Sequence, residues 1–383
     1  MSLSQKRQVS SPRLGLGIIG CGARMIDLLG PLLTQNAEHI HVAAVCDPHP
    51  ASIQAARDHL RRDVDVVATP TALARRSDVD WVAIGSWNSQ HPDHVEAVVD
   101  AGKHLFCEKP LAIDAPGVRR IATCLRRHQG LFVYGLTLRF SPFYRAVRAC
   151  LQHGDIGRIV SLEFNETLPP AHGGYIMRGW RRQRVHAGPH ILEKCCHDVD
   201  LLHWFTGAEV QRVASFGGQT FFLPENSDAE GGYNDWPALD PVDPFQGDAD
   251  IVDNQVAIIE LDSGVRATFH TNLNAAIPER RFYILGTRGT LRADVLTGRI
   301  EVGRIGESKR EVWDIPEGRG GHGGGDFVLR DTLQRAMLEG IAPNFGIEEA
   351  VRSSLTCLAI DESRQKNIVV TRADADTFDE AHP

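Results

Sequence analysis

The sequence predicts an α/β fold: a doubly wound parallel sheet at the N-terminus, then an α+β domain with a large, open, mainly antiparallel sheet. Two observations support this prediction. Up to about residue 135, short apolar runs alternate with amphipathic helical stretches, which indicates a parallel sheet covered on both faces. Beyond it, strand-like runs follow one another across short turns, which is typical of antiparallel pairing. We therefore expect two domains, residues 1–135 and 136–383.

The individual elements follow from the same pattern in chain order. In the first domain, apolar runs predict strands at 14–19, 42–46, 64–68, 81–85, 104–107 and 131–134, with helices between them such as 91–101 and 115–128. In the second domain, they predict strands at 159–164, 210–216, 254–261, 265–271, 281–285, 290–293 and 368–370, with helices at 189–206 and 348–365.

Two segments of the second domain lack this regularity. Residues 224–253 hold nine acidic residues, four prolines and no Lys or Arg. We interpret them as a solvated surface insertion rather than a calcium site, because the acids lack the spacing of a coordination loop. Residues 318–325 hold six glycines around Arg319 and His322, which is typical of a linker or of a loop that approaches a ligand closely.

The composition narrows the classes of partner. The 383 residues include 41 Lys+Arg and 49 Asp+Glu, and this net charge of −8 argues against nucleic acid or an anionic membrane as the main partner. No run approaches the roughly 20 apolar residues that span a bilayer. Residues 1–13 are polar and do not resemble a secretory signal. The eight cysteines show no paired spacing, which favours reduced, mostly buried thiols in a cytoplasmic protein without a zinc site.

A glycine motif follows the first predicted strand. The sequence GLGIIG at 15–20 matches G-x-G-x-x-G but lies within the strand, so the turn to the helix is GCGARM at 20–25. Gly20 would make the tight turn and Gly22 would let the backbone approach a pyrophosphate, which then meets the N-terminus of a helix beginning at Ala23 and Arg24. Met25 replaces the third glycine, which predicts looser packing of helix on strand. An ordinary strand–helix turn is the alternative.

An acid at the end of the second strand favours a dinucleotide ligand. Asp47 is placed to accept hydrogen bonds from an adenosine ribose and would repel the extra phosphate of NADP. We therefore expect NAD, with NADP less favoured. The alternative role of Asp47 is a helix cap before Pro48, and the two roles are compatible.

The segment Cys107-Glu108-Lys109-Pro110 follows the fifth predicted strand. In open α/β sheets, ligands bind at the carboxyl ends of the strands, so Lys109 is expected beside the nicotinamide. The alternative is an ordinary surface ion pair.

With these motifs, the chain resembles the Gfo/Idh/MocA family of oxidoreductases. The resemblance rests on NSQH at 88–91, AGKHLFCEKPL at 101–111, RFSP at 139–142 and GTRGTL at 286–291, and it extends from about residue 14 to 370. It implies an NAD-binding Rossmann domain, a Glu-Lys-Pro motif and a second domain built on an open antiparallel sheet. Further cofactor contacts are then expected at Ser86, Asn88, His91, Glu108 and Lys109.

The predicted helix at 189–206 carries titratable groups on one face. Glu193 and His197 are four residues apart, so a continuous helix would bring carboxylate and imidazole together, with Asp200 nearby. A structural Glu–His pair and a metal site are the alternatives, and we expect no metal. The resemblance favours catalysis, because the family pairs an acid with a histidine at these positions. Glu193 departs from the Asp of many members.

These expectations combine into an NAD-dependent dehydrogenase acting on a secondary alcohol of a cyclic polyol, sugar or sugar-derived acid. His197 is the candidate general base, Lys109 would stabilise charge on the same oxygen, and Glu193 would orient His197 or bind a neighbouring hydroxyl. Further substrate contacts are expected, with surface or interface roles as the alternative, from Arg139, Tyr175, Trp180, Arg181 and His322.

Two other functions stay open. The segment His322–Asp326 resembles a loop in relatives that hydrolyse glycosides with NAD as a recycled cofactor. Some relatives are non-catalytic NAD sensors, which would need neither Lys109 nor His197. The open sheet of the second domain predicts a homodimer or homotetramer.

Overall fold

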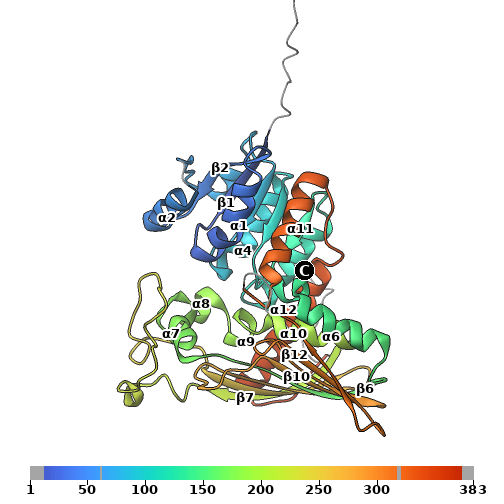
Figure 1. The fold of residues 1–383 in the computed structure, drawn as a ribbon. Helices are drawn as coiled ribbons and strands as arrows, with labels where there is room; N and C mark the ends of the chain where they lie inside the picture. The colour runs from blue at the N-terminus through green and yellow to red at the C-terminus, as the bar shows by residue number, and fades with distance from the viewer. Residues whose placement is uncertain (1–12, 61–62, 317–320, 373–383) are drawn as a thin grey trace, which may run out of the picture.

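The predicted fold class is confirmed by a computed structural model, which describes residues 13–60, 63–316 and 321–372 (Figure 1). The first sheet is parallel throughout and has the order β2-β1-β3-β4-β5. Its strands are β1 (Leu14–Ile19), β2 (Ile40–Cys46), β3 (Trp81–Ile84), β4 (His104–Cys107) and β5 (Phe132–Tyr134). The strand predicted at 64–68 is reduced to a single bridge between Val45 and Val66.

Helices connect the strands of this sheet. They are α1 (Ala23–Gln35), α2 (Pro50–Leu60), α3 (Pro70–Ala74), α4 (His91–Asp100) and α5 (Ala115–Arg126), with the short η1 (Asn88–Gln90) before α4. The connection after β1 leads to β2 on one side, whereas the connection after β3 leads to β4 on the other, so the strand order reverses between β1 and β3. This is the switch point at which open α/β sheets bind ligands.

The second sheet has nine strands in the order β13-β12-β11-β10-β6-β9-β8-β7-β14, antiparallel except between β6 and β9. The strands are β6 (Ile159–Thr167), β7 (Val210–Gly218), β8 (Asn254–Leu261), β9 (Arg266–Asn272), β10 (Arg281–Gly286), β11 (Gly289–Asp294), β12 (Arg299–Arg304), β13 (Arg310–Asp314) and β14 (Val370–Thr371). Sequence analysis missed β12 and β13, and β13 is mostly exposed and therefore lacks an apolar face.

The helical elements between β5 and β8 are α6 (Pro142–His153), α7 (Pro170–Arg178), α8 (Arg184–Ala187), α9 (His190–Glu193) and α10 (Cys196–Thr206), with η2 (Thr137–Phe140), η3 (Trp180–Arg182) and η4 (Pro224–Asn226). Of these, α10 packs on one face of the sheet, where it contacts β6. The prediction of one helix over 189–206 was wrong, since the chain leaves the helical path at Lys194 and Cys195.

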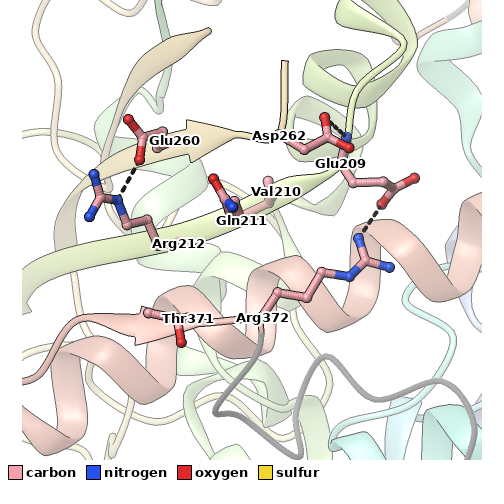
Figure 2. A pocket seen from close by; sticks show the side chains of 8 residues that line it. All are labelled: Glu209, Val210, Gln211, Arg212, Glu260, Asp262, Thr371 and Arg372. Carbon is pink, nitrogen blue, oxygen red and sulfur yellow. Dashed lines mark hydrogen bonds and ion pairs between the residues drawn. The ribbon is translucent and has the colours of Figure 1, made fainter. Parts of the chain in front are cut away.

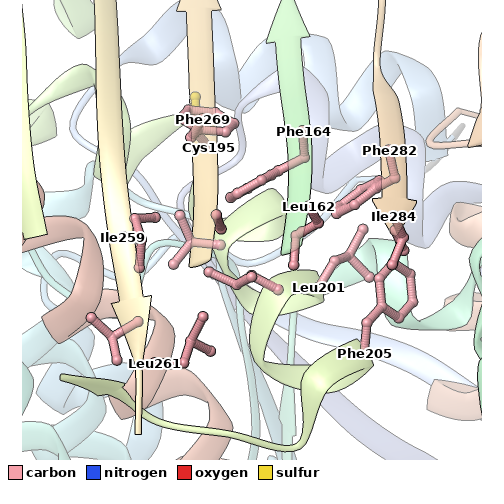
Figure 3. Close-up of a cluster of buried hydrophobic side chains, with 14 of the residues drawn as sticks. Leu162, Phe164, Cys195, Leu201, Phe205, Ile259, Leu261, Phe269, Phe282 and Ile284 are labelled. Atoms are coloured by element: carbon pink, nitrogen blue, oxygen red, sulfur yellow. The ribbon is translucent and has the colours of Figure 1, made fainter. Parts of the chain in front are cut away.

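The core of the second domain lies between α10 and the sheet (Figure 3). Leu201 and Phe205 project from α10 onto Phe164 and Phe282, whose rings stack with centroids 5.3 Å apart on neighbouring strands. The opposite face of the sheet is open, and it exposes apolar side chains such as Phe216, which pairs with Val256 across β7 and β8.

The chain returns to the first sheet at its end. Leu329 and Leu333 of α11 (Gly325–Glu339) pack in the same cluster as Leu16 of β1, and α12 (Ile347–Lys366) contacts both α5 and α10. The two sheets are therefore joined by α12 as well as by the chain near residue 135, and the division at that residue stays a prediction (Figure 1).

The acidic insertion is more ordered than expected. Tyr233, Phe245 and Ile251 are buried in a small core with Phe222 and other apolar side chains. The carboxylate of Asp253 accepts hydrogen bonds from the backbone N–H groups of residues 220, 221 and 222. The prediction of a solvated surface insertion holds for eight of its nine acidic residues, which are exposed, whereas scattered aromatic residues give the segment a small core that was not predicted.

Two further sequence predictions concern cysteines and membranes. All eight cysteines have free thiols, and only Cys150 is not fully buried. Across 13–60, 63–316 and 321–372, no helix combines the length and apolar character needed to cross a bilayer.

Candidate functional site

The glycine turn after β1 forms an open cradle at the N-terminus of α1. Gly20 has a φ of +83°, and a Cβ there would lie 2.4 Å from the backbone nitrogen of Ser86. Gly22 caps α1 without a side-chain acceptor and faces open space, and the first turn holds no acid. Backbone N–H groups at such a terminus suit a pyrophosphate, so these residues fit a dinucleotide.

Met25 does not loosen this turn. Its side chain is buried against Gly85, where a Cβ would lie 2.5 Å from the methionine Cε. Gly85, which follows β3, therefore provides the space that a third glycine on the helix would have provided. The prediction of looser packing was therefore wrong, and Met25 has a packing role at the cofactor turn.

Asp47 is bound to the glycine turn. One carboxylate oxygen accepts from the backbone N–H of Cys21 at 2.7 Å, and the other accepts from His49 at 2.8 Å. Asp47 therefore closes the turn that precedes α2 and is not the cap of the helix itself, whose first bond runs to the carbonyl of residue 49. Each carboxylate oxygen retains a lone pair for a ribose hydroxyl.

His91 and Asn88, which were also expected at the cofactor, form hydrogen bonds to backbone carbonyls. His91 is fully buried, with its ring nitrogens 2.8 Å from the carbonyl of Pro110 and 3.2 Å from that of Ser86. Asn88 donates to the carbonyl of Ala187, which joins the first domain to α8 at 2.8 Å. These contacts fix the loops after β3 and β4, so His91 and Asn88 position the site through the backbone.

Arg24 forms a network instead of pointing to solvent. Its guanidinium bonds Glu108 at 2.8 Å, Asp326 at 2.7 Å and the Thr137 hydroxyl at 3.3 Å. The Glu-Lys-Pro segment is thereby tied to α1 and to the start of α11.

Lys109 crosses to the second domain. Its Nζ donates to the backbone carbonyl of Glu193 at 2.5 Å and lies 3.7 Å from the Glu193 carboxylate. The same carboxylate accepts from Arg181 at 3.0 Å. Burial acts to raise the pKa of Glu193, but the charges of Lys109, Arg181 and Lys194 outweigh it and lower the pKa to about 2. Glu193 is therefore an anion that holds two cations in place.

His197 lies in this buried cluster without a hydrogen-bond partner. Both ring nitrogens are buried, and neither is bonded to any described residue. Burial lowers the pKa of His197 well below its usual value, with further lowering by Lys109 and His322. The expected contact of the Glu193 carboxylate with His197 is not formed, because the break between α9 and α10 directs Glu193 toward Lys109 and Arg181.

A different carboxylate orients a neighbouring imidazole. His322 has a φ of +58°, and its Nδ1 lies 3.0 Å from the carboxylate of Asp326. Its ring packs edge to face on that of His197, with centroids 5.4 Å apart. Residues 318–320 of the glycine-rich segment lie outside the described residues, whereas His322 lies in the site.

Three of the residues expected at the substrate form an aromatic wall. Arg181 lies over the rings of Tyr175 and Trp180, at 5.0 and 4.5 Å, and donates to the Tyr175 hydroxyl at 2.8 Å. Trp180 stacks on Trp87 of the first domain, with centroids 5.5 Å apart.

Arg139 lies elsewhere. Its guanidinium makes a buried, bidentate pair with Asp200 at 2.6 and 2.8 Å. Arg139 therefore anchors α10, and its expected substrate contact is not seen in this arrangement.

Sequence analysis missed a second group of buried polar side chains beside His197. Lys194 lies 3.3 Å from Glu166, which pairs with Arg280 at 3.0 Å. Burial and Lys194 lower the pKa of His172 to about 2, and His190 has an Nδ1 without a partner among the described residues. The sequence signal that could have indicated this group is the adjacent pair of charges Glu193 and Lys194. A continuous helix would point these two side chains in different directions, so a second polar group beside the first could have been expected.

Comparisons with known proteins agree with this architecture. Residues 14–136 match the family model described as an oxidoreductase family with an NAD-binding Rossmann fold, and residues 144–292 match the GFO/IDH/MocA C-terminal domain. The putative oxidoreductase YteT of Bacillus subtilis is 21% identical over 82% of this chain and 88% of its own. Inositol 2-dehydrogenase of Ralstonia nicotianae is 30% identical over 51% of this chain and 55% of its own, about half of that enzyme.

Solved structures share the fold. Apo scyllo-inositol dehydrogenase from Lactobacillus casei superposes with a TM-score of 0.73 at 22% identity, covering 95% of this chain and 100% of that one. Levoglucosan dehydrogenase, solved with NADH and levoglucosan, gives 0.76 at 18% identity, covering 94% and 99%. Since the two family models together span most of the chain, the protein belongs to the Gfo/Idh/MocA family of oxidoreductases and carries its NAD-binding Rossmann domain.

Proposed function

We propose that this protein is an NAD-dependent dehydrogenase that oxidises a secondary alcohol of a cyclic polyol, sugar or sugar-derived acid. The observation that carries the proposal is the buried cluster in which Lys109 reaches the carbonyl of Glu193, while both nitrogens of His197 lack partners within the part of the chain that the structure describes. Unpartnered buried polar atoms are costly unless a ligand completes their hydrogen bonds. A hydroxyl group is such a ligand.

His197 serves as the general base. Its lowered pKa keeps the imidazole neutral, so that a ring nitrogen can accept the proton of a substrate hydroxyl. Bound NAD supplies the hydride acceptor. Lys109 hydrogen-bonds the same oxygen and stabilises the negative charge that develops on it.

Glu193 acts as a positioning residue. Its carboxylate and carbonyl hold Lys109, and its carboxylate fixes Arg181, which in turn braces Tyr175 and Trp180. Planar aromatic faces next to a guanidinium suit a ring that carries hydroxyl groups. The names of the inositol and levoglucosan enzymes agree with a substrate of this class.

The test is the absorbance of NADH during incubation with NAD and a panel of inositols, aldoses and sugar acids. We expect net NADH with at least one of them, and a preference for NAD over NADP because Asp47 lies beside the glycine turn. His197→Ala should lower kcat by about 10²–10⁴-fold while NAD still binds. His153→Ala, an exposed histidine on α6, is the control. A parental rate in His197→Ala would refute the assignment.

A second candidate function is NAD-dependent glycoside hydrolysis. It is favoured by the proximity of His197 to His322, whose imidazole is oriented by Asp326. Elimination and re-addition at a sugar ring need more than one proton-transfer group, and two imidazoles supply them. The two functions differ in products: the glycosidase releases a chromogenic aglycone from an aryl glycoside without net NADH.

We further propose that the open sheet face forms a homo-oligomer. Phe216 and Ile258 are 67% and 61% exposed there, and exposed apolar patches of this kind mark association surfaces. Light scattering of the parental chain and of Phe216→Asp measures the effect, and a monomeric parental chain contradicts it.

A further inference from the structure

A second cavity lies outside the candidate active site. It has a volume of about 520 Å³ and lies among α6, the end of α10 and the start of α12. Four of its lining residues are arginines, namely Arg139, Arg145, Arg148 and Arg352, whereas Glu349 is its one lining carboxylate. In a chain with a net charge of −8, such a gathering of guanidinium groups is unusual.

Two of the four guanidinium groups have an acidic partner. Arg139 pairs with Asp200, and Arg352 lies 2.5 Å from Glu209. Glu349 accepts from the backbone N–H of residue 346 and lies 3.8 Å from Arg139. The acids around the cavity, Asp200, Glu209 and Glu349, therefore interact with Arg139, Arg352 and the N-terminus of α12.

The other two arginines have no acidic partner. Within the described residues, no carboxylate lies within ion-pair distance of Arg145 or Arg148. Arg145 donates from Nε to the backbone carbonyl of Arg139 at 3.1 Å. Arg148 lies over the ring of Trp204 at 4.6 Å, and Arg139 lies at 5.5 Å from the same ring. Arg145 is therefore held by a backbone carbonyl, and Arg148 by an indole that it shares with Arg139.

This arrangement has an electrostatic cost. Burial lowers the pKa of Arg148, and the neighbouring Arg139 lowers it further. An anion in the cavity would remove that repulsion, because guanidinium groups bind phosphate oxygens through paired N–H donors.

The larger surface cavity offers a contrast (Figure 2). It has a volume of about 870 Å³, and its cations already have partners, since Arg212 pairs with Glu260 and Arg372 with Glu209. Asp262 adds a further carboxylate to its lining. Because both of these arginines already have acidic partners, this cavity gives no reason to expect an anionic ligand.

We propose that the cavity formed by Arg139, Arg145, Arg148 and Arg352 binds a small phosphate-bearing molecule. Arg145 and Arg148 contact the phosphate, and Asn344 and Gln152 at the rim offer further donors. A volume of about 520 Å³ exceeds what inorganic phosphate fills and lies in the range of small-molecule sites, so an organic phosphate is the expected occupant.

The test is isothermal titration of the full chain with inorganic phosphate and, separately, with glycerol 3-phosphate. Saturating NADH is present so that the pyrophosphate cradle is filled, and chloride holds the ionic strength constant. We expect saturable binding that is at least tenfold weaker in Arg145→Gln/Arg148→Gln. Arg335→Gln, an exposed arginine on α11, should bind like the parental chain. Tighter binding of glycerol 3-phosphate identifies an organic phosphate, and equal affinity identifies free phosphate.

A second variant distinguishes a loss of phosphate binding from a loss of folding. Asn344→Asp leaves every arginine in place but adds a carboxylate at the rim, and it should weaken phosphate binding without changing the melting temperature in NADH alone. The proposal is overturned if neither ligand binds saturably, or if the double variant binds phosphate as tightly as the parental chain.

Discussion

The two domains supply the candidate site in different ways. In the first, the cradle at Gly20 and the amine of Lys109 follow β1 and β4, which end at the same edge of one parallel sheet. In the second, the site side chains come from separate elements that include β6, α7, η3, α9, α10 and the loop before α11. Parallel strands bring their following loops to one edge whatever the side chains are, whereas the second set depends on tertiary packing.

Among the variants that compare the two domains, the largest loss of rate should come from the residue that joins them at the site. Lys109→Met removes the ammonium that bonds the Glu193 carbonyl and that faces the reacting oxygen in the proposed mechanism. We expect kcat to fall about 10²–10³-fold, as for the loss of one donor to a developing oxyanion. The measurement is the initial rate of NADH formation with the best substrate of the panel.

A matched control exists in the same domain. Lys103 also donates to a backbone carbonyl, that of Arg76, at 3.1 Å, but it precedes β4 and so lies at the opposite edge of the parallel sheet from Lys109. Lys103→Met should keep the parental rate. Equal rates for Lys109→Met and the parental chain would show that the first domain contributes only the cofactor cradle.

The largest loss of stability should be in the second domain. Asp198 makes a buried pair with Arg280 at 2.6 Å, and Arg280 also bonds Glu166. Asp198→Asn leaves the guanidinium with less compensating charge, and we expect the free energy of unfolding to fall by about 3–5 kcal/mol. Urea denaturation followed by fluorescence measures it.

An exposed pair serves as the comparison for that measurement. Glu260→Gln removes the partner of Arg212 on the surface of β8 and should leave the denaturation midpoint unchanged within error. If Asp198→Asn behaves in the same way, the buried network does not hold the second half of the site together.

The same contrast explains how far sequence analysis reached. The strands at 14–19, 104–107 and 254–261 were predicted to the residue, because apolar runs between turn residues leave little choice. The break at Lys194 and Cys195 could not be predicted, since neither Pro nor Gly marks it. Cys195 contacts Thr271 of β9, a contact known only after the sheet forms. That break directs Glu193 away from His197, so Asp326 rather than Glu193 provides the carboxylate–imidazole pair.

A smaller effect should appear at the cofactor turn of the first domain. Gly85→Ala places a methyl group against the side chain of Met25, and overpacking of this kind costs about 1–3 kcal/mol of unfolding free energy. In Gly85→Ala/Met25→Ala the contact is relieved, so the double variant should be more stable than the sum of the single changes predicts. If the two changes are additive in the double-mutant cycle, the side chain of Met25 does not occupy the space that the absence of a Cβ at Gly85 leaves free.

The smallest effect, a shift in pH dependence, connects the two halves of the site. A general base acts when deprotonated, and burial together with Lys109 and His322 lowers the pKa of His197 well below 6.5. The kcat/KM for alcohol oxidation should therefore be level at neutral pH and fall only on the acid side of 6.5. Lys109→Met removes one of the charges that disfavour the imidazolium, so its acid limb should move to higher pH, whereas that of Lys103→Met should not. If the acid limb lies at the same pH in the parental chain, Lys109→Met and Lys103→Met, the charge of Lys109 does not act on His197. That result would contradict the proposal that the two residues, one from each domain, bind the same substrate hydroxyl.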